Sequence, residues 1–281
     1  MILPGSASQS LGAALADELD EPLAVVETQR FADGEFKVRV PDAGGERAVV
    51  VAATVSAEAH LELLQLQDLA RAHFEEVVTV LPYMGYARQD RAFRDGEPVS
   101  ARAVARAVST GTDRVLAVNP HEPSIAEFFD VPFEVVDAAA RLAEPLPDLA
   151  DPLFLAPDEG AIGIAETVCD AYGAGSCDHF EKTRDYDTGD VTVEPAGADP
   201  DGREVVLVDD IVATGSTMSA AIARLHERGV ADVYVTCLHP MFADNARAKL
   251  ADAGVAGVWG TDTIERPVSD VSVAPTLAER L

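Results

Sequence analysis

Short runs of apolar residues alternate along the chain with longer segments in which apolar residues recur at helical spacing. Continuous apolar runs bounded by polar or turn residues are typical of strands that are buried on both faces of a sheet. The strand candidates are Ala48–Ala53, Val77–Leu81, Arg114–Val118, Leu153–Ala156, Val205–Val208, Val233–Leu238 and Val255–Trp259.

Helical spacing or composition marks the segments between these runs. Leu61, Leu64 and Leu69 mark one helix, residues 101–108 a second and residues 220–225 a third. Because strands that alternate with helices form parallel sheets with crossover helices, the pattern predicts an α/β protein with two doubly wound parallel-sheet domains. The proline-rich segment 142–152 marks a boundary, so we expect one domain over residues 1–146 and another over residues 147–281.

Composition excludes several classes of protein. No apolar run approaches the length of a membrane span, and the N-terminal residues MILPGSASQS show neither a basic segment nor a signal-peptide pattern. Cys169, Cys177 and Cys237 lack zinc-site spacing and cannot all pair as disulfides. We therefore expect a cytoplasmic protein that does not bind membranes.

Residues 205–218, VVLVDDIVATGSTM, carry the clearest chemical pattern. A buried strand leads to Asp209 and Asp210, then to a tight turn around Gly215 and to a helix over Met218–Arg228. Gly215 lets the backbone approach an anion closely, and the first turn of the helix offers N–H groups and a positive dipole end. The carboxylates suit sugar hydroxyls or a phosphate-bound Mg²⁺. The segment predicts a site for a phosphorylated sugar, with a capped strand–turn–helix as the simpler alternative. The turn adds the hydroxyls of Thr214, Ser216 and Thr217.

A second polar segment, PYMGYARQDR at residues 82–91, follows a predicted strand directly. The guanidinium groups of Arg88 and Arg91 are fork-shaped donors that can hold a polyphosphate, with Gln89 and Asp90 beside them. The alternative is an ordinary surface loop with an Arg–Asp pair.

A third segment, RFADGEFKVRV at residues 30–40, contains a hairpin turn signal at Asp33-Gly34. An exposed Phe31 can stack on a nucleotide base while the carboxylates of Asp33 and Glu35 accept from an exocyclic amine. Taken alone, the segment also fits a hairpin without a ligand.

Further candidates lie at strand ends and in a polar segment. His121 follows a predicted strand and is either a metal ligand or a satisfied loop histidine. Asp158 is either a helix N-cap or a carboxylate that contacts ribose or a metal. Lys182 and Arg184 lie in FEKTRDYDTGD, residues 180–190, a mobile loop or a solvated hairpin. Because the chain has only three lysines, we expect Lys182 to be present because its ammonium group is needed.

Together these segments resemble the family of ribose-phosphate pyrophosphokinases, also called phosphoribosyl pyrophosphate synthetases. The resemblance runs nearly end to end in the family's order: FADGE, PYMGYARQDR, PVSAR, NPHEPSIAEFFDVP, APDEGA, EKTR, VDDIVATGST, TDTIER and VSVAP. It implies two domains of the phosphoribosyltransferase-like type. It also implies transfer of the diphosphoryl group of ATP to the 1-hydroxyl of ribose 5-phosphate with Mg²⁺, and assembly as a dimer or hexamer.

The resemblance also implies a role for each candidate residue. Adenine would be held across a subunit interface, ATP contacted by the second segment, and catalysis supported by a closing loop. The N-terminal domain would contact ATP, and the C-terminal domain would bind ribose 5-phosphate. The implied residues are Phe31, Asp33 and Glu35 for adenine; Arg88, Gln89 and Asp90 for ATP; His121 and Asp158 for the metal; Lys182 and Arg184 for catalysis; Asp209 and Asp210 for the ribose hydroxyls; and Ala213, Thr214, Gly215, Ser216 and Thr217 for the 5-phosphate.

Several positions depart from the family pattern. Asn119 stands where many members have Asp, so the metal site is expected to be less charged. SAEAH replaces an asparagine-rich stretch near residues 55–60, and the short segment around Lys182 resembles the archaeal branch. Two rival functions are a phosphoribosyltransferase, which uses the same phosphate loop, and a non-catalytic regulatory homologue.

The net charge of −28 is unusual for a folded enzyme, and it is spread along the chain rather than gathered in a tail. Such self-repulsion destabilises a compact state when salt is low. The absence of a basic stripe also argues against nucleic-acid binding. We expect adaptation to a high-salt cytoplasm.

Thermal unfolding in a KCl series tests this expectation. Because molar salt screens charges beyond about 3 Å, the melting temperature should rise markedly from dilute to molar KCl. Equal stability at both ends of the series would rule out salt adaptation.

Overall fold

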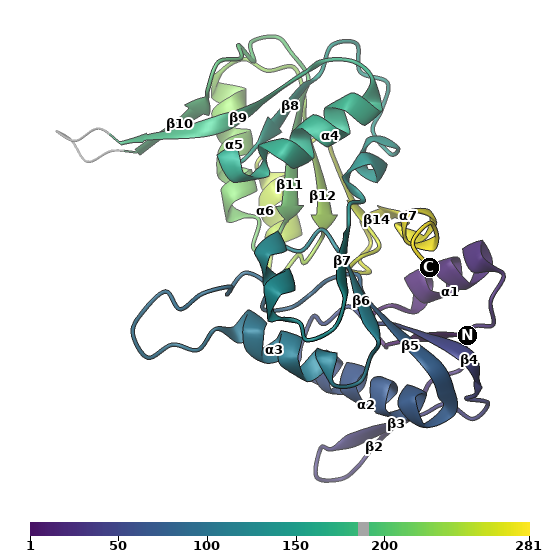
Figure 1. Ribbon diagram of the computed structural model, residues 1–281. Coiled ribbons are helices and arrows are strands. Elements are labelled where there is room, and N and C mark those ends of the chain that lie inside the picture. The colour runs from purple at the N-terminus through teal and green to yellow at the C-terminus, as the bar shows by residue number, and fades with distance from the viewer. Residues whose placement is uncertain (185–190) are drawn as a thin grey trace. The chain divides into compact units, whose positions relative to one another are not determined.

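The computed structural model describes residues 1–184 and 191–281, and for residues 182–184 and 191–194 it describes the backbone alone (Figure 1). The chain divides into two compact units. The first unit comprises Met1–Asp137, Asp262–Glu265 and Ser272–Leu281, and the second comprises Ala138–Thr261 and Arg266–Val271. No helix in the described part of the chain is long and apolar enough to cross a membrane.

The first unit is built on a parallel sheet in the strand order β1-β4-β5-β6-β7. Helices α2 and α3 cover one face of this sheet, and α1 and α7 pack together on the other (Figure 1). The short strands β2 and β3 form an antiparallel hairpin outside the sheet. Its elements are β1 (Ile2–Pro4), α1 (Gln9–Leu19), β2 (Glu27–Arg30), β3 (Phe36–Arg39), β4 (Gly45–Val51), α2 (Ala57–His73), β5 (Phe74–Leu81), α3 (Ser100–Ser109), β6 (Arg114–Val118), η1 (Pro123–Phe128), β7 (Phe133–Val136) and α7 (Ala274–Ala278).

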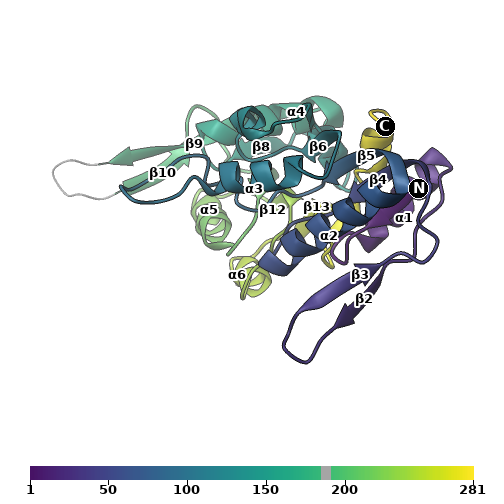
Figure 2. The same cartoon turned by 60° about the horizontal axis from the view of Figure 1, so that its bottom comes forward.

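The second unit is built on a mixed sheet in the order β10-β9-β8-β11-β12-β13-β14, parallel except for the β9–β10 pair. Helix α4 covers one face, and α5 and α6 cover the other (Figures 1 and 2). Its elements are η2 (Ala139–Ala143), β8 (Leu153–Ala156), η3 (Glu159–Ala161), α4 (Ile162–Tyr172), β9 (Ser176–Arg184), β10 (Val191–Pro195), β11 (Val205–Ile211), α5 (Ser216–Glu227), β12 (Val233–His239), α6 (Ala246–Asp252), β13 (Gly257–Thr261) and β14 (Ser269–Val271).

The apolar runs become the central strands because both faces of each sheet are covered. Val205–Val208 are fully buried in β11, and alternate residues of the strand face opposite layers. On one side Leu207 packs in a cluster with Met218, Ile222 and Leu225 of α5. Each such buried side chain contributes roughly 1.5–3 kcal/mol. The prediction of doubly wound α/β domains is confirmed.

The C-terminal segment returns to the first unit, whereas the predicted boundary after residue 146 had placed all later residues in the second domain. The backbone N–H of Val273 donates to Asp262 Oδ1 at 2.8 Å, and Glu265 Oε1 accepts from the N–H of Ser10 at 2.6 Å. These bonds join residues far apart in sequence and place α7 beside α1. A proline-rich segment in the sequence cannot reveal such a return.

In the second unit, the sheet order changes direction between β8 and β11. The chain runs from β8 to β9 on one side, and then comes back to β11 on the other side of β8. In open α/β sheets, ligands bind beyond the carboxyl ends of the strands at such a switch point. Asp158 follows β8, and the TGST turn follows β11, so both lie at this position.

Two glycines in the turn between α4 and β9 allow a matched test of this packing. Gly173 and Gly175 both have left-handed backbone angles, with φ of 82° and 94°. A Cβ at Gly173 would meet nothing within 4 Å, whereas one at Gly175 would lie 2.2 Å from the carbonyl oxygen of Pro152.

Gly173→Ala should therefore cost only the left-handed strain, about 1–2 kcal/mol. Gly175→Ala should cost about 1–3 kcal/mol more, because the backbone at Pro152, just before β8, must shift as well. Denaturant unfolding of both variants measures the difference, and equal costs would contradict the described packing.

Candidate active site

The turn after β11 is fixed by neighbouring backbone. The N–H of Phe242 donates to the carbonyl of Val212 at 3.0 Å, and the N–H of Ala243 donates to that of Ala213 at 2.9 Å. Gly215 is the N-cap of α5 with φ of 71°, and a Cβ there would meet Ala246 atoms at 3.1–3.3 Å. The segment that follows β12 therefore holds the turn from the side, and glycine is required at its centre.

The side chains of this turn are open to solvent. Thr214, Ser216 and Thr217 are exposed, whereas Gly215 is buried and Ala213 half-buried. The first N–H groups of α5 have no partner inside the helix, and they add to its positive dipole end. Backbone N–H groups and hydroxyls thus gather around one accessible turn, which suits a phosphate group.

Two half-buried carboxylates stand next to the turn, at the end of β11. The N–H of Asp210 donates to Asp209 Oδ1 at 2.9 Å. Burial raises the pKa of Asp209 well above its ordinary value, and the charges of Asp210 and Asp158 raise it further. The raised pKa favours the protonated form of Asp209, and hydroxyl donors or a cation beside the pair would stabilise the ionised form.

Asp158 caps the short helix η3. Its Oδ1 accepts from the N–H of Gly160 at 3.1 Å, and the residue is exposed. The N-cap alternative is therefore what the structure contains. This cap leaves further lone pairs of the carboxylate open to solvent, so a metal role for Asp158 stays a prediction.

Lys182 and Arg184 lie on β9, whose partner is the antiparallel strand β10. Lys182 is opposite Val193, and Arg184 is opposite Val191. The described residues on either side of 185–190 thus pair as antiparallel strands. The side chains of both residues fall outside the described part of the chain, and so do residues 185–190.

In the first unit, the predicted adenine residues lie together at the tip of the β2–β3 hairpin (Figure 1). The N–H of Phe31 donates to the carbonyl of Glu35 at 2.7 Å, and the N–H of Glu35 donates to Asp33 Oδ1 at 3.1 Å. The ring of Phe31 is 42% exposed, with Lys37 Nζ 5.6 Å from its centroid. The tip thus presents an aromatic ring and two carboxylates, and their role in base recognition stays a prediction.

The predicted ATP loop begins after β5 and is held by Thr54. The N–H of Thr54 donates to the carbonyl of Tyr83 at 2.9 Å, and its hydroxyl accepts from the N–H of Gly85 at 2.8 Å. Tyr86 then takes a left-handed conformation with φ of 65°. This sharp turn leads into the predicted ATP residues.

Those residues differ in their contacts. Arg88 is exposed, while Gln89 and Asp90 are half-buried. Gln89 is anchored to α3, because its Oε1 accepts from the hydroxyl of Ser100 and its carbonyl accepts from the N–H of Ala101. Arg88 is thus the residue of the three most open to a polyphosphate.

His121 follows β6 and is exposed. Asn119, with φ of 35°, donates from Nδ2 to Asp137 Oδ1 at 2.7 Å. A carboxylate therefore does lie near this strand end, although Asn119 replaces the usual Asp of the family.

The carboxylates of Asp158, Asp209 and Asp210 suit a magnesium ion that is bound partly by the substrate. Among the described residues, no group of three or more His, Cys, Asp or Glu side chains could hold a metal ion. Mg²⁺ is usually bound through one or two carboxylates, water and substrate phosphates, so a complete protein cage is not needed. Burial and the neighbouring charges raise the pKa of Asp209, and a nearby cation would favour its ionised form.

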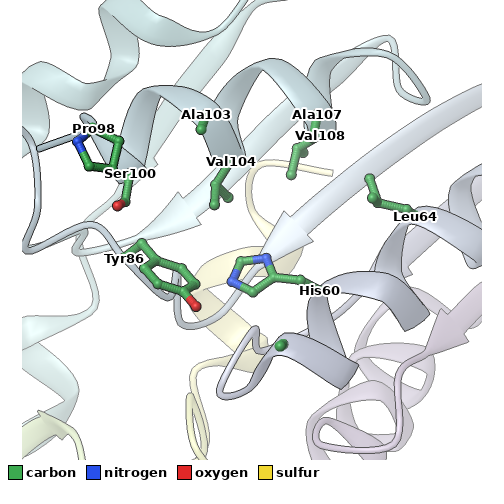
Figure 3. Close-up of a pocket in the computed structure, with 10 residues that line it drawn as sticks. His60, Leu64, Tyr86, Pro98, Ser100, Ala103, Val104, Ala107 and Val108 are labelled. Atoms are coloured by element: carbon green, nitrogen blue, oxygen red, sulfur yellow. The ribbon is translucent and has the colours of Figure 1, made fainter. Parts of the chain in front are cut away.

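A cavity of about 400 Å³ lies beside the predicted ATP loop, between α2 and α3 (Figure 3). Its walls are mainly apolar, and the rings of His60 and Tyr86 lie 5.4 Å apart on one side. His60 Nε2 is buried and has no hydrogen-bond partner within the described structure. No local sequence pattern predicts this cavity, because its lining comes from α2, the loop and α3. The lining residues are Ala57, His60, Leu64, Tyr86, Pro98, Ser100, Ala103, Val104, Ala107 and Val108.

Comparison with known proteins matches both units. The N-terminal domain of ribose phosphate pyrophosphokinase matches residues 1–111, and the phosphoribosyl transferase domain matches residues 127–275. A ribose-phosphate pyrophosphokinase of Halobacterium salinarum is 60% identical, with the whole of both chains covered. One of Methanosarcina mazei is 42% identical and covers 100% of this chain and 94% of its own length. The chain belongs to the ribose-phosphate pyrophosphokinase family.

A solved structure supports the same assignment. The phosphoribosylpyrophosphate synthetase of Mycobacterium smegmatis is 29% identical, with a TM-score of 0.84 over 100% of this chain and 96% of that one. The family match spans both units and includes the N-terminal domain, which disfavours a phosphoribosyltransferase. The archaeal relatives agree with the archaeal-like, salt-adapted member that was expected.

His60 makes stability depend on pH in a defined direction. Burial lowers the pKa of His60 below its ordinary value. The unfolded state, with a pKa near 6.5, therefore binds a proton that the folded state excludes. The contribution of His60 to stability is complete above that pKa and is lost as pH falls below it.

His60→Leu should therefore flatten the decline in melting temperature between about pH 7.5 and 5.5. His73→Leu, at an exposed position of the same helix, is the matched control and should keep the wild-type slope. If both variants kept that slope, the buried imidazole would not be the titrating group.

Proposed function

We propose that ribose 5-phosphate binds at the turn after β11 and that ATP binds at the loop after β5. The reaction is that of the family: the diphosphoryl group of ATP passes to the 1-hydroxyl of ribose 5-phosphate, giving 5-phosphoribosyl 1-pyrophosphate and AMP. The observation that carries the proposal is the exposed TGST turn at the switch point of the second sheet, with two carboxylates beside it.

The second unit is the ribose-5-phosphate side of this proposal. The 5-phosphate accepts hydrogen bonds from the backbone N–H groups and hydroxyls of residues 213–217. Asp209 and Asp210 accept from the ribose hydroxyls, which replaces part of their mutual repulsion with hydrogen bonds. The sugar is thereby held at both ends, and its 1-hydroxyl has a fixed direction.

The chemical step is an in-line displacement at phosphorus. The oxygen of the 1-hydroxyl forms a bond to the β-phosphorus of ATP, the bond from that phosphorus to the α,β-bridging oxygen breaks, and AMP leaves. The hydroxyl proton is released in the process. Such a step depends on positioning and on neutralising charge. We assign Lys182 and Arg184 to the diphosphoryl group in transfer, and Arg88 to the polyphosphate.

Mg²⁺ is the proposed metal, with His121 and Asp158 as candidate ligands. These residues would hold the ion, which would supply positive charge to neutralise the phosphates. Asp158 already contributes to the excess of negative charge around Asp209.

The hairpin tip is proposed to serve a neighbouring subunit. Strand β2 is exposed along its length, and Phe31 is exposed at the turn. In a dimer or hexamer, Phe31 of one subunit stacks on the adenine held by another, and Asp33 and Glu35 accept from its amino group. Gln89 and Asp90 approach the same nucleotide. We place this assembly in the cytoplasm.

An assay of product identity tests the function. Purified protein in molar KCl with ATP, Mg²⁺ and ribose 5-phosphate should release AMP, and mass spectrometry should show 5-phosphoribosyl 1-pyrophosphate. Pyrophosphate release from added 5-phosphoribosyl 1-pyrophosphate and a free base, without AMP formation from ATP, would instead indicate a phosphoribosyltransferase.

Lys182→Ala should reduce turnover by about 10²-fold or more, because a cation is removed from a charged transition state. Folding and ribose 5-phosphate binding should survive. Arg224→Ala is the control, since it removes a positive charge from an exposed ion pair with Glu227 on α5. Near-normal turnover of the Lys182 variant would contradict the assigned role.

A further inference from the structure

Lys249 is a lysine without an assigned role in a chain that contains only three. Lys37 lies over the Phe31 ring, and Lys182 is a predicted catalytic residue on β9. Lys249 lies on α6, 33 residues beyond Ser216 in the sequence. In a protein that otherwise uses arginine for its positive charge, a lysine at a defined contact is notable.

The ammonium group of Lys249 reaches the proposed phosphate turn. Its Nζ donates to the carbonyl oxygen of Thr214 at 3.2 Å and to the hydroxyl oxygen of Ser216 at 3.0 Å. Helix α6 is close enough for this contact because Ala246, one turn earlier, packs directly against Gly215. The side chain is half-buried, so its stem lies along the protein while its charged end meets the turn.

These contacts direct the hydroxyl hydrogen of Ser216. Its oxygen accepts from Lys249, and Thr214 Oγ1 donates to the same oxygen at 3.4 Å. With its lone pairs engaged in this way, the Ser216 hydroxyl has its own hydrogen left to donate. The solvent side of the turn, where an anion would sit, is an open direction for that donation.

The positive charge of Lys249 also favours the binding of an anion at the turn. The carboxylates of Asp210 and Asp158 lie close enough to Asp209 for their charges to raise its pKa, and the same charges oppose the approach of an anion. An ammonium group at hydrogen-bond distance from the turn offsets that potential where the phosphate would bind.

We propose that Lys249 is a positioning residue for the 5-phosphate of ribose 5-phosphate. It fixes the carbonyl of Thr214 and the hydroxyl of Ser216, and it supplies local positive charge to a strongly acidic protein. The proposal rests on the proposed function, because it takes the turn after β11 as the ribose 5-phosphate site.

Lys249→Met removes the ammonium group and keeps the length of the side chain. We expect the KM for ribose 5-phosphate, and its Kd by calorimetry in molar KCl, to rise about tenfold, as for loss of a charged hydrogen bond. The KM for ATP and kcat should stay within about twofold, because the 5-phosphate does not react and its contacts are the same in the ground state and the transition state. Lys249→Arg should restore most of the affinity.

Two controls separate this role from a structural one. Arg247→Ala removes a positive charge from an exposed position on the same helix, and it should leave the KM for ribose 5-phosphate unchanged. Ser216→Ala combined with Lys249→Met should weaken binding by less than the product of the two single effects, because both act through one hydroxyl.

The outcomes are distinguishable. If the wild-type protein released no AMP and bound no ribose 5-phosphate, the proposed function itself would fail. If the wild type bound ribose 5-phosphate and folded Lys249→Met bound it equally well, only the role of Lys249 would be overturned. A folded Lys249→Arg variant as weak as Lys249→Met would also overturn it, as would fully additive effects with Ser216→Ala.

Discussion

The rest of the site depends on one constraint. The segment after β12 fixes the turn after β11 in place. Backbone bonds from Phe242 and Ala243, close packing of Ala246 on Gly215, and the side chain of Lys249 all act on the same few residues. A phosphate site made of N–H groups and hydroxyls works only if those groups are already aimed, because aiming them on binding would cost conformational entropy. The fold provides this by placing α6 beside the start of α5.

Charge is the second constraint, and it acts against the binding of anions at this turn. Both proposed substrates are anions, while the chain carries a net charge of −28. At the end of β11 in the second unit, burial raises the pKa of Asp209, and the neighbouring charge of Asp210 raises it further. A cation placed within a hydrogen bond of the turn offsets this field only locally, and that is enough because an anion is bound there by short-range contacts. The acidic surface and the phosphate turn can therefore coexist.

Much of this architecture could be predicted from sequence, because its signals are local. The runs at Val205–Val208 and Val233–Leu238 are buried on both faces, so their continuous apolar sequence is enough to predict strands. The turn at Thr214–Thr217 also followed from residue types. Lys249 could not be placed, since only the packing of α6 brings it to the turn. The same holds for the cavity around His60 and for the C-terminal return to the first unit. The catalytic roles of Lys182 and Arg184 stay a prediction drawn from the family resemblance.

The most direct measurement is a crystal structure of the protein in high salt with ribose 5-phosphate bound. The account predicts density for the phosphate against residues 213–217, with the ribose hydroxyls on Asp209 and Asp210. A sugar phosphate bound in a single well-ordered place elsewhere on the chain, with this turn empty, would contradict the account at its centre.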